Sequence, residues 1–426
     1  MTNDSIAIFK FGGASVRDAA GVRNLTSILQ TYAGQPLSVV ISAMGKTTNA
    51  LETVVDSYWA GNTDEALKRW AVVEANHLTI SSELSLSEQD TQPVQAHLDA
   101  VRALLRMPPV GSYDQVYDQL VSMGEILSTQ LVTAYLRQQG LPARWTDARQ
   151  LISTDATFRE GRVDWTVTKN QLRAAMPAAT TGTAEIMITQ GFIGSTSTGE
   201  TTTLGREGSD YTAAILAYCL DAESVTIWKD VPGVLNADPK YFDDTVLLTA
   251  LTYQDATELA YYGATVIHPK TIKPLQNKGI PLYVRSFLQP TQPGTVVGVA
   301  EVSSPVASFI FKVNQWLISL HPTDFSFITE DNLSLIFSEL SAAGLKINLM
   351  QQTALNFSFV VDNRPDRIER LFAALRPHFR VNYNEGLELI TIRHYNQATI
   401  DRVLIDKTLL LEQKSRTTVQ LVVREG

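Results

Sequence analysis

Residues 5–16 read SIAIFKFGGASV, a short run of β-forming residues that ends in a pair of glycines. Residues 17–29, RDAAGVRNLTSIL, follow with a pattern typical of a helix. A strand, a glycine turn and a helix start bring backbone N–H groups and the positive end of a helix dipole together, which suits a phosphate group. Lys10 at the end of the strand adds a positive charge there. An ordinary strand-to-helix turn with a surface lysine remains the alternative for this stretch alone.

The same alternation of β-rich runs and helical patterns continues for most of the next three hundred residues, up to about position 298. It predicts an α/β fold with a mainly parallel central sheet flanked by helices. Residues from about 50 to 118 depart from this rhythm and predict a helical excursion from the sheet. The further strand candidates are LSVVISA (37–43), PARWTD (142–147), AEIMITQGF (184–192), SVTIWKD (224–230) and IPLYVRSF (280–287).

The last quarter of the chain has a different rhythm. We predict a first domain over residues 1–298 and a linker over 299–308. Residues 309–383 then give the order βαββαβ, which is typical of a ferredoxin-like α+β unit. Residues 384–426 start a second unit of this kind with the strand LELITIRHY, but it is truncated and lacks an obvious final helix.

Composition excludes several classes of protein. The chain has 426 residues, 44% of them hydrophobic and 19% charged, as expected for a globular protein with at least two domains. A net charge of -9 argues against general binding to nucleic acid or to an anionic membrane. The first ten residues do not resemble a signal peptide, no apolar run is long enough to span a membrane, and the single cysteine fits a reducing compartment, so we expect a cytoplasmic protein. Cys219 lies in an apolar helical run, so we predict an inert core thiol.

Residues 42–51, SAMGKTTNAL, contain a Gly-Lys-Thr that resembles the end of a P-loop. The first glycine of that motif would fall at Val40, so we reject a P-loop. What remains is a second strand end that opens into a polar loop carrying Thr48. This threonine could bind a small polar ligand or only cap the following helix.

Four further stretches concentrate charge and glycine. They are VSMGEILST (121–129), TTTLGREGSDYTAA (201–214), IWKDVPGVLNADPK (227–240) and YYGATVIHPK (261–270). Ser209 or Asp210 is the expected N-cap of a helix that follows GREG, and His268 is expected to cap a helix rather than bind a metal. We expect six such loops, each following a strand, to converge on one cleft, because ligands of open α/β sheets bind at the carboxyl ends of the strands.

Taken together, these stretches closely resemble the motifs of the aspartate kinase family. KFGGASV, VVISAMGKTTN, SMGE, GREGSDYTA, KDVPGVLNADP, GATVIHP and PLYVRSF occur in the family's order over nearly the whole chain. The resemblance implies an amino-acid kinase fold followed by tandem ACT regulatory domains. It also implies transfer of the γ-phosphate of ATP, with Mg²⁺, to the side-chain carboxylate of L-aspartate. That reaction gives 4-phospho-L-aspartate, the first step toward lysine, threonine and methionine.

The resemblance also implies roles for individual residues. Lys10, Arg206 and Asp210 would be catalytic. Aspartate would be bound by Thr48, Glu125, Arg206, Ser209 and Asp210. The nucleotide would contact Lys10, Gly12, Gly13, Lys229, Asp230, Gly233, Asp238, Lys240, Thr265 and Val266, with Mg²⁺ held only through the phosphates of ATP. Lysine or threonine as a feedback effector would contact Gln351, Gln352 and Thr353, and the ACT domains would form a homodimer or a higher oligomer.

The chain departs from the family pattern at a few positions. Glu207 stands where the family has a glycine, and we expect its side chain to point away from the cleft. Thr265 stands where the family has a lysine, and Lys229 replaces a threonine. These departures leave two alternatives open: another carboxylate kinase of the same fold, acting on glutamate or acetylglutamate, or a non-catalytic amino-acid sensor.

Overall fold

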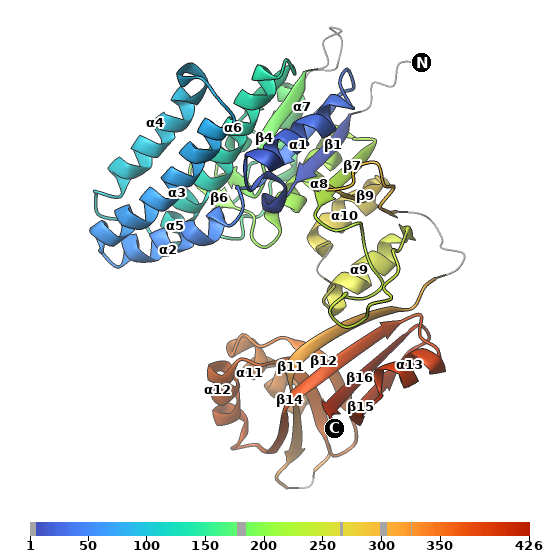
Figure 1. Cartoon of the computed structure of the whole chain (residues 1–426). Coiled ribbons are helices and arrows are strands. Elements are labelled where there is room, and N and C mark those ends of the chain that lie inside the picture. Colours follow the sequence, from blue (N-terminus) through green and yellow to red (C-terminus); the bar gives the residue numbers. More distant parts are fainter. Residues whose placement is uncertain (1–5, 177–184, 265–266, 299–304, 325) are drawn as a thin grey trace. The chain divides into compact units, whose positions relative to one another are not determined.

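The computed structural model describes residues 6–176, 185–264, 267–298, 305–324 and 326–426 (Figure 1). The chain divides into two compact units. The first unit comprises residues 1–234, 247–257 and 266–302, and the second comprises 235–246, 258–265 and 303–426.

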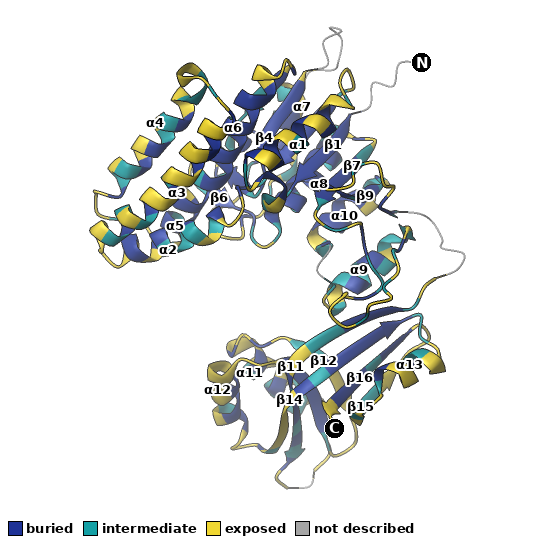
Figure 2. Cartoon of the chain, in the orientation of Figure 1, coloured by how far each residue is buried: buried dark blue, intermediate teal, exposed yellow. Residues whose placement is uncertain are grey.

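An eight-stranded sheet forms the centre of the first unit, in the order β3-β4-β2-β1-β7-β9-β10-β8. Within this sheet, the six neighbouring strands β3, β4, β2, β1, β7 and β9 run parallel to one another, so the predicted mainly parallel sheet is confirmed. Their bounds are β1 (Ala7–Phe11), β2 (Leu37–Ile41), β3 (Ala143–Thr146), β4 (Ile186–Gln190), β7 (Ser224–Lys229), β8 (Ala250–Leu251), β9 (Leu282–Ser286) and β10 (Thr295–Val297). β1, β2 and β4 are buried along their whole length (Figure 2), as expected when helices cover both faces of a parallel sheet.

Helices lie around this sheet, and α1 (Ala19–Gln30) and α6 (Met123–Gln138) share one apolar core with it. α8 (Gly208–Leu220) packs against β1, β2 and β7, and α7 (Trp165–Ala175) and α10 (Pro269–Lys278) pack against α8. α9 (Tyr253–Tyr262) is divided between the two units. Where we predicted a helical excursion, the chain forms α2 (Thr47–Trp59), α3 (Thr63–Glu83), α4 (Glu88–Leu104) and α5 (Tyr113–Val121), which Figure 1 shows together at one side of the sheet. Two 3₁₀ turns, η1 (Gly13–Val16) and η2 (Ala148–Gln150), and the hairpin β5 (Ile193–Ser195) and β6 (Thr201–Thr203) complete the unit.

The second unit contains one antiparallel six-stranded sheet in the order β12-β13-β11-β14-β16-β15. The strands are β11 (Ser308–Pro322), β12 (Ile347–Gln352), β13 (Phe357–Asp362), β14 (Phe379–Arg393), β15 (Lys407–Lys414) and β16 (Thr418–Glu425). The helices are α11 (Glu330–Ala342), α12 (Pro365–Leu375) and α13 (Gln397–Val403).

Two ferredoxin-like halves share the long strands β11 and β14. Residues 315–322 of β11 pair with 379–387 of β14 in one half, and residues 308–312 pair with 389–393 in the other. The pairing register shifts between these two segments. We predicted separate strands at 379–383 and 387–395, and this is wrong, because a β-bulge bends a continuous strand without ending it. The second half therefore obtains its missing strand from residues 308–312, which precede the first half in the sequence.

The second half has α13 as its helix after β14 in the described part of the chain. Ile400 and Val403 of this helix share an apolar cluster with Phe309. Residues 235–246 add Ala237 and Phe242 to the same cluster. Residues 235–246 thus cover part of the apolar surface that a second helix would otherwise cover, although they lie far from this half in the sequence.

Candidate active site

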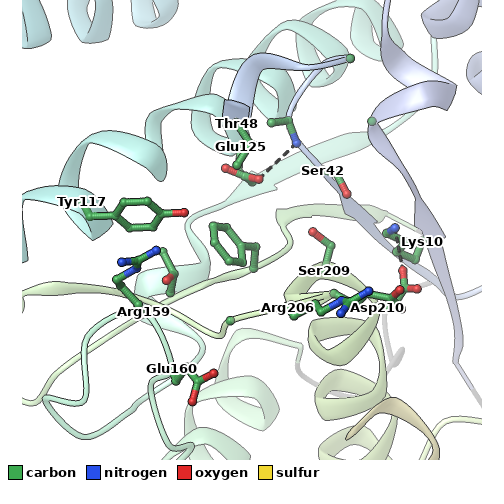
Figure 3. A pocket seen from close by; sticks show the side chains of 18 of the residues that line it. Lys10, Ser42, Thr48, Tyr117, Glu125, Arg159, Glu160, Arg206, Ser209 and Asp210 are labelled. Atoms are coloured by element: carbon green, nitrogen blue, oxygen red, sulfur yellow. Dashed lines mark hydrogen bonds and ion pairs between the residues drawn. The ribbon is translucent and has the colours of Figure 1, made fainter. Parts of the chain in front are cut away.

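A cavity of about 730 Å³ lies in the first unit at the carboxyl ends of the parallel strands (Figure 3). Lys10 reaches it from the end of β1, Ser42 directly follows β2, Phe192 follows β4, and Lys229 ends β7. This is the position in which an open α/β sheet binds its ligands. The volume is in the usual range for small-molecule sites.

The cavity brings together most of the residues that we predicted for the substrate and some of those for the nucleotide. Those in its wall are Lys10, Gly13, Thr48, Glu125, Arg206, Ser209, Asp210 and Lys229. One premise was wrong, since Glu125 lies in the first turn of α6 rather than in a loop after a strand.

Lys10 and Asp210 form the closest charged contact in this wall. Lys10 Nζ lies 2.6 Å from Oδ1 of Asp210, and Lys229 Nζ lies 3.5 Å from Oδ2 of the same carboxylate. Burial alone would raise the pKa of Asp210, but the charges of Lys10 and Lys229 outweigh it and lower the pKa below its ordinary value. Asp210 is therefore a buried, ionised carboxylate that fixes two ammonium groups at one end of the cavity.

Glu125 is in a different electrostatic environment. Its side chain is buried, and Oε1 accepts a hydrogen bond of 3.4 Å from the backbone N–H of Ala43. No described residue donates a hydrogen bond to Oε2, which is also buried. Burial raises the pKa of Glu125 to about 8, so a cationic group of a ligand would be needed to stabilise its charged form.

The helix that follows GREG begins differently from our prediction. α8 starts at Gly208, and its N-cap is Glu207 rather than Ser209 or Asp210. Glu207 has φ 53° and ψ 31°, a left-handed conformation that favours glycine, and its side chain makes no capping hydrogen bond. Asp210 lies in the first turn of the helix, where its negative charge interacts favourably with the positive end of the helix dipole.

Two loops of the wall are packed too closely for side chains larger than hydrogen. A Cβ atom on Gly13 would lie 2.7 Å from the carbonyl oxygen of Ala43 and 2.9 Å from that of Gly45. The glycine pair therefore positions the end of β1 against the loop after β2. The 3₁₀ turn η1 separates these glycines from α1, so α1 does not start directly at the turn.

Several residues of the wall were absent from our predictions. They are Ser42, Ala43, Gly45, Tyr117, Arg159, Glu160, Phe192, Thr203, Gly205, Glu207 and Gly208. Ser42 and Phe192 could have been found, because each lies at the carboxyl end of a predicted strand, 37–43 and 184–192 respectively. Arg159 and Tyr117 lie outside all the stretches that we singled out, although Tyr117 is only four residues before the stretch 121–129.

The remaining predicted nucleotide residues do not line this cavity. They are Gly12, Asp230, Gly233, Asp238 and Lys240. Residues 238 and 240 belong to the second unit, where the Asp238 carboxylate accepts a hydrogen bond from the N–H of Lys240. Thr265 and Val266 lie outside the described residues.

Two residues behave as the sequence predicted. Cys219 is buried, and burial raises the pKa of its thiol to about 11, so it is not a nucleophile. His268 is the N-cap of α10 and accepts a hydrogen bond from the N–H of Lys270.

Among the described residues, no cluster of three or more His, Cys, Asp or Glu side chains could hold a metal ion. No helix among them is long and apolar enough to cross a membrane.

The chain matches known proteins over almost its full length. Residues 5–286 match the amino acid kinase family. The chain is 30% identical to lysine-sensitive aspartokinase 3 of Escherichia coli over 395 residues, covering 91% of this chain and 86% of the relative. This chain belongs to the aspartokinases.

Structural comparison agrees with this assignment to the aspartokinases. E. coli aspartokinase III in complex with aspartate and ADP is 28% identical, with a TM-score of 0.81, and the match covers 98% of this chain and 96% of that one. Its complex with lysine and aspartate is 27% identical, with a TM-score of 0.82 and coverage of 98% and 95%. The chain also matches a bifunctional aspartokinase/homoserine dehydrogenase of Arabidopsis thaliana at 28% identity, with 88% of this chain matched, but spans only 42% of its length. The predicted fold and kinase class are confirmed.

The structure accounts for the glycine that aspartokinases have where this chain has Glu207. Glu207 replaces a glycine at a left-handed backbone position, so the family's glycine is explained by conformation. Glu207 forms part of the cavity wall, and the direction of its side chain stays a prediction. Its Oε2 is buried, and no described residue donates a hydrogen bond to it.

Proposed function

We propose that this chain transfers the γ-phosphoryl group of ATP to the side-chain carboxylate of L-aspartate, giving 4-phospho-L-aspartate and ADP. The observation that supports this most is the cavity wall, which carries four cationic side chains (Lys10, Lys229, Arg159 and Arg206), two of them, Lys10 and Lys229, paired with a buried Asp210. The wall offers no serine–histidine or cysteine–histidine pair. A cavity with many cations and no activated nucleophile suits a reaction whose nucleophile arrives already as an anion.

The chemistry needs no general base. A carboxylate with an ordinary pKa near 4 is ionised at neutral pH, so its oxygen attacks the γ-phosphorus directly. The bond between that phosphorus and the bridging oxygen of ADP breaks, and ADP leaves with the electron pair. The obstacle is the approach of two anions, which Lys10 and Lys229 would reduce by stabilising charge on the transferring group.

Substrate recognition follows from the same wall. Arg206 is exposed to the cavity, and none of the described residues forms an ion pair with it, so it is available for a carboxylate of aspartate. The ammonium group of aspartate would approach Glu125 and favour its charged form. Thr48, Ser209 and Asp210 complete the proposed substrate site.

The nucleotide would bind beside Lys10, with its phosphates near Gly12 and Gly13. Lys229, Asp230, Gly233, Asp238, Lys240, Thr265 and Val266 remain proposed contacts of the nucleotide. Mg²⁺ fits this site only as a partner of the phosphates, because Asp210 is already engaged by two lysines. Bound there, Mg²⁺ would neutralise phosphate charge during transfer.

We also propose that the second unit binds a feedback effector and assembles the chain into a homodimer or higher oligomer. E. coli aspartokinase III, 27% identical, has been solved in complex with lysine and aspartate, so lysine is the first candidate and threonine the second. Gln351 and Gln352 end β12, and Thr353 follows them; all three are exposed, as contact with an effector would require.

ADP release in a coupled assay, with Mg-ATP and either L-aspartate or L-glutamate, tests the function. Turnover with aspartate and not with glutamate is expected, and it should decrease when lysine or threonine is added. Absence of turnover with aspartate would contradict the proposal and favour a non-catalytic sensor. Turnover that no amino acid changes would overturn only the proposed feedback.

A further inference from the structure

Arg159 lies at a strained position in a loop that no motif of the sequence marks. Its φ is 65°, a left-handed conformation that is unfavourable for residues other than glycine. The loop is closed by an antiparallel bridge between Thr154 and Val163, so Arg159 lies near its tip. A backbone held in this unfavourable conformation must be fixed by contacts with its surroundings.

A buried carboxylate fixes the backbone of Arg159. Asp118 on α5 is inaccessible to solvent, and its Oδ2 accepts hydrogen bonds from the N–H of Arg159 at 2.9 Å and of Thr203 at 2.8 Å. Its Oδ1 accepts a third from the hydroxyl of Thr203 at 2.7 Å. Asp118 thus ties the loop to β6, and both Arg159 and Thr203 line the active-site cavity.

The side chain of Arg159 is also positioned. Its guanidinium carbon lies 4.2 Å from the centroid of the Tyr117 ring, and the Tyr117 hydroxyl donates a hydrogen bond of 2.7 Å to Glu52. Such stacking fixes the plane of a guanidinium group and leaves its N–H edge available. The ion pair with Asp114 is 3.5 Å long between half-exposed side chains and so contributes little.

Arg159 and Arg206 come from neighbouring backbone segments. A Cβ atom on Gly205 would lie 3.2 Å from the carbonyl oxygen of Arg159, so the loop lies against the residue before Arg206. In Figure 3, Arg159 lies with Tyr117 at the opposite end of the cavity from Lys10 and Asp210. The cavity therefore has a cation at the end away from the lysines.

Among the described residues, none of the carboxylates that line the cavity, which are Glu125, Glu160, Glu207 and Asp210, forms an ion pair with Arg159 or Arg206. Asp210 is engaged by Lys10 and Lys229, and burial favours the protonated form of Glu125. Two guanidinium groups that line one cavity repel each other unless an anion binds there. L-Aspartate carries two carboxylates, of which one must face the transferring phosphate and the other must lie at a distance from it.

We propose that Arg159 is a specificity-determining residue that binds the α-carboxylate of L-aspartate, while the side-chain carboxylate faces Lys10. The inference rests on the proposed function. Arg206 then lies between the two carboxylates and orients the substrate. A bidentate contact between a planar guanidinium and a carboxylate would account for an arginine at a position whose φ of 65° suits glycine.

The test compares L-aspartate with its α-amide, which keeps the reacting side-chain carboxylate and lacks the α-carboxylate charge. Arg159→Gly is the main variant, because glycine relieves the positive φ and should fold at least as well as the parent. We expect kcat/KM for L-aspartate to fall about 10- to 100-fold, mainly through KM. For the α-amide, kcat/KM as a substrate, or the inhibition constant as a competitive inhibitor, should change less than threefold. KM for ATP should also change less than threefold.

Two controls separate recognition from structure. Asp114→Asn removes the ion pair of Arg159 outside the cavity and should leave kcat and KM for both substrates unchanged. Arg159→Lys keeps the charge but not the planar fork and should recover only part of the loss. Equal losses for aspartate and its α-amide, or no loss in Arg159→Gly, would overturn the role of Arg159. No turnover of aspartate by the parent chain would instead refute the proposed function.

Discussion

The ammonium group of Lys10, at the end of β1, lies 2.6 Å from the carboxylate of Asp210, in the first turn of α8. Both side chains are almost completely buried, with 10% and 3% of their surface exposed. The pair therefore has two roles. It stabilises the junction of strand and helix, and in the reaction that we propose it would place a cation beside the transferring phosphoryl group.

Two variants separate the catalytic role of this ion pair from its structural role. We expect Lys10→Met to lower kcat by about 10²- to 10³-fold, because a cation at the transferring group is lost. It should also destabilise the fold by about 3 kcal/mol, because Asp210 loses its closest partner while remaining buried. Lys10→Met combined with Asp210→Asn should regain much of that stability but none of the activity, as measured by urea unfolding and steady-state kinetics. Recovery of activity in the double variant would contradict a catalytic role for Lys10.

Glu125 predicts an unusual dependence of stability on pH. Its pKa is about 8 in the fold and 4.5 ordinarily, so between these values the folded chain keeps a proton that the unfolded chain releases. The contribution of Glu125 to the free energy of unfolding is therefore fully present below pH 4.5 and decreases as pH rises toward 8. Glu125→Gln should abolish this decrease, measured as the difference between the two unfolding profiles from pH 5 to 9.

Aspartate supplies a control for the same residue. Its ammonium group should stabilise the charged form of Glu125, so saturating aspartate should reduce the difference between parent and variant above pH 7. Parallel unfolding profiles of the parent and Glu125→Gln, without ligand, would show that the carboxyl group titrates normally.

Glu207→Gly tests a strained position in the cavity wall. Glycine adopts φ 53° without strain, so we expect the variant to gain about 0.5–1 kcal/mol of stability. Removing a carboxylate from a cavity for an anionic substrate should also lower KM for aspartate, by about two- to fivefold. An unchanged KM with raised stability would mean that Glu207 contributes only its backbone to the wall.

The two adjacent glycines after β1 should differ in tolerance to alanine. In Gly13→Ala the new methyl group would lie 2.7 Å from a backbone oxygen of the next loop, so the loops must separate. We expect KM for ATP to rise at least tenfold and the melting temperature to fall. Gly12→Ala is the matched control, because its methyl group would meet only the flexible end of Lys10, at 3.4 Å. Equal effects of both variants would contradict the packing argument.

The sequence alone predicted the class of fold and most of the strands. Hydrophobic periodicity and glycine turns are local properties, so they located β1, β2, β7 and β9 to within two residues. The ordered motifs also predicted part of the cavity wall, because Lys10, Glu125, Arg206 and Asp210 lie within or beside recognisable turns and helix starts.

Only the tertiary structure decided which distant residues meet. Arg159 and Tyr117 enter the cavity because Asp118 ties a loop to β6, a contact between segments with no shared pattern in the sequence. The sharing of β11 and β14 between two halves likewise depends on pairing between residues 308–312 and 389–393. Local propensity determines helices, strands and turns. Packing and hydrogen bonding between distant segments determine the residues of a site, because those energies exist only once the chain has folded.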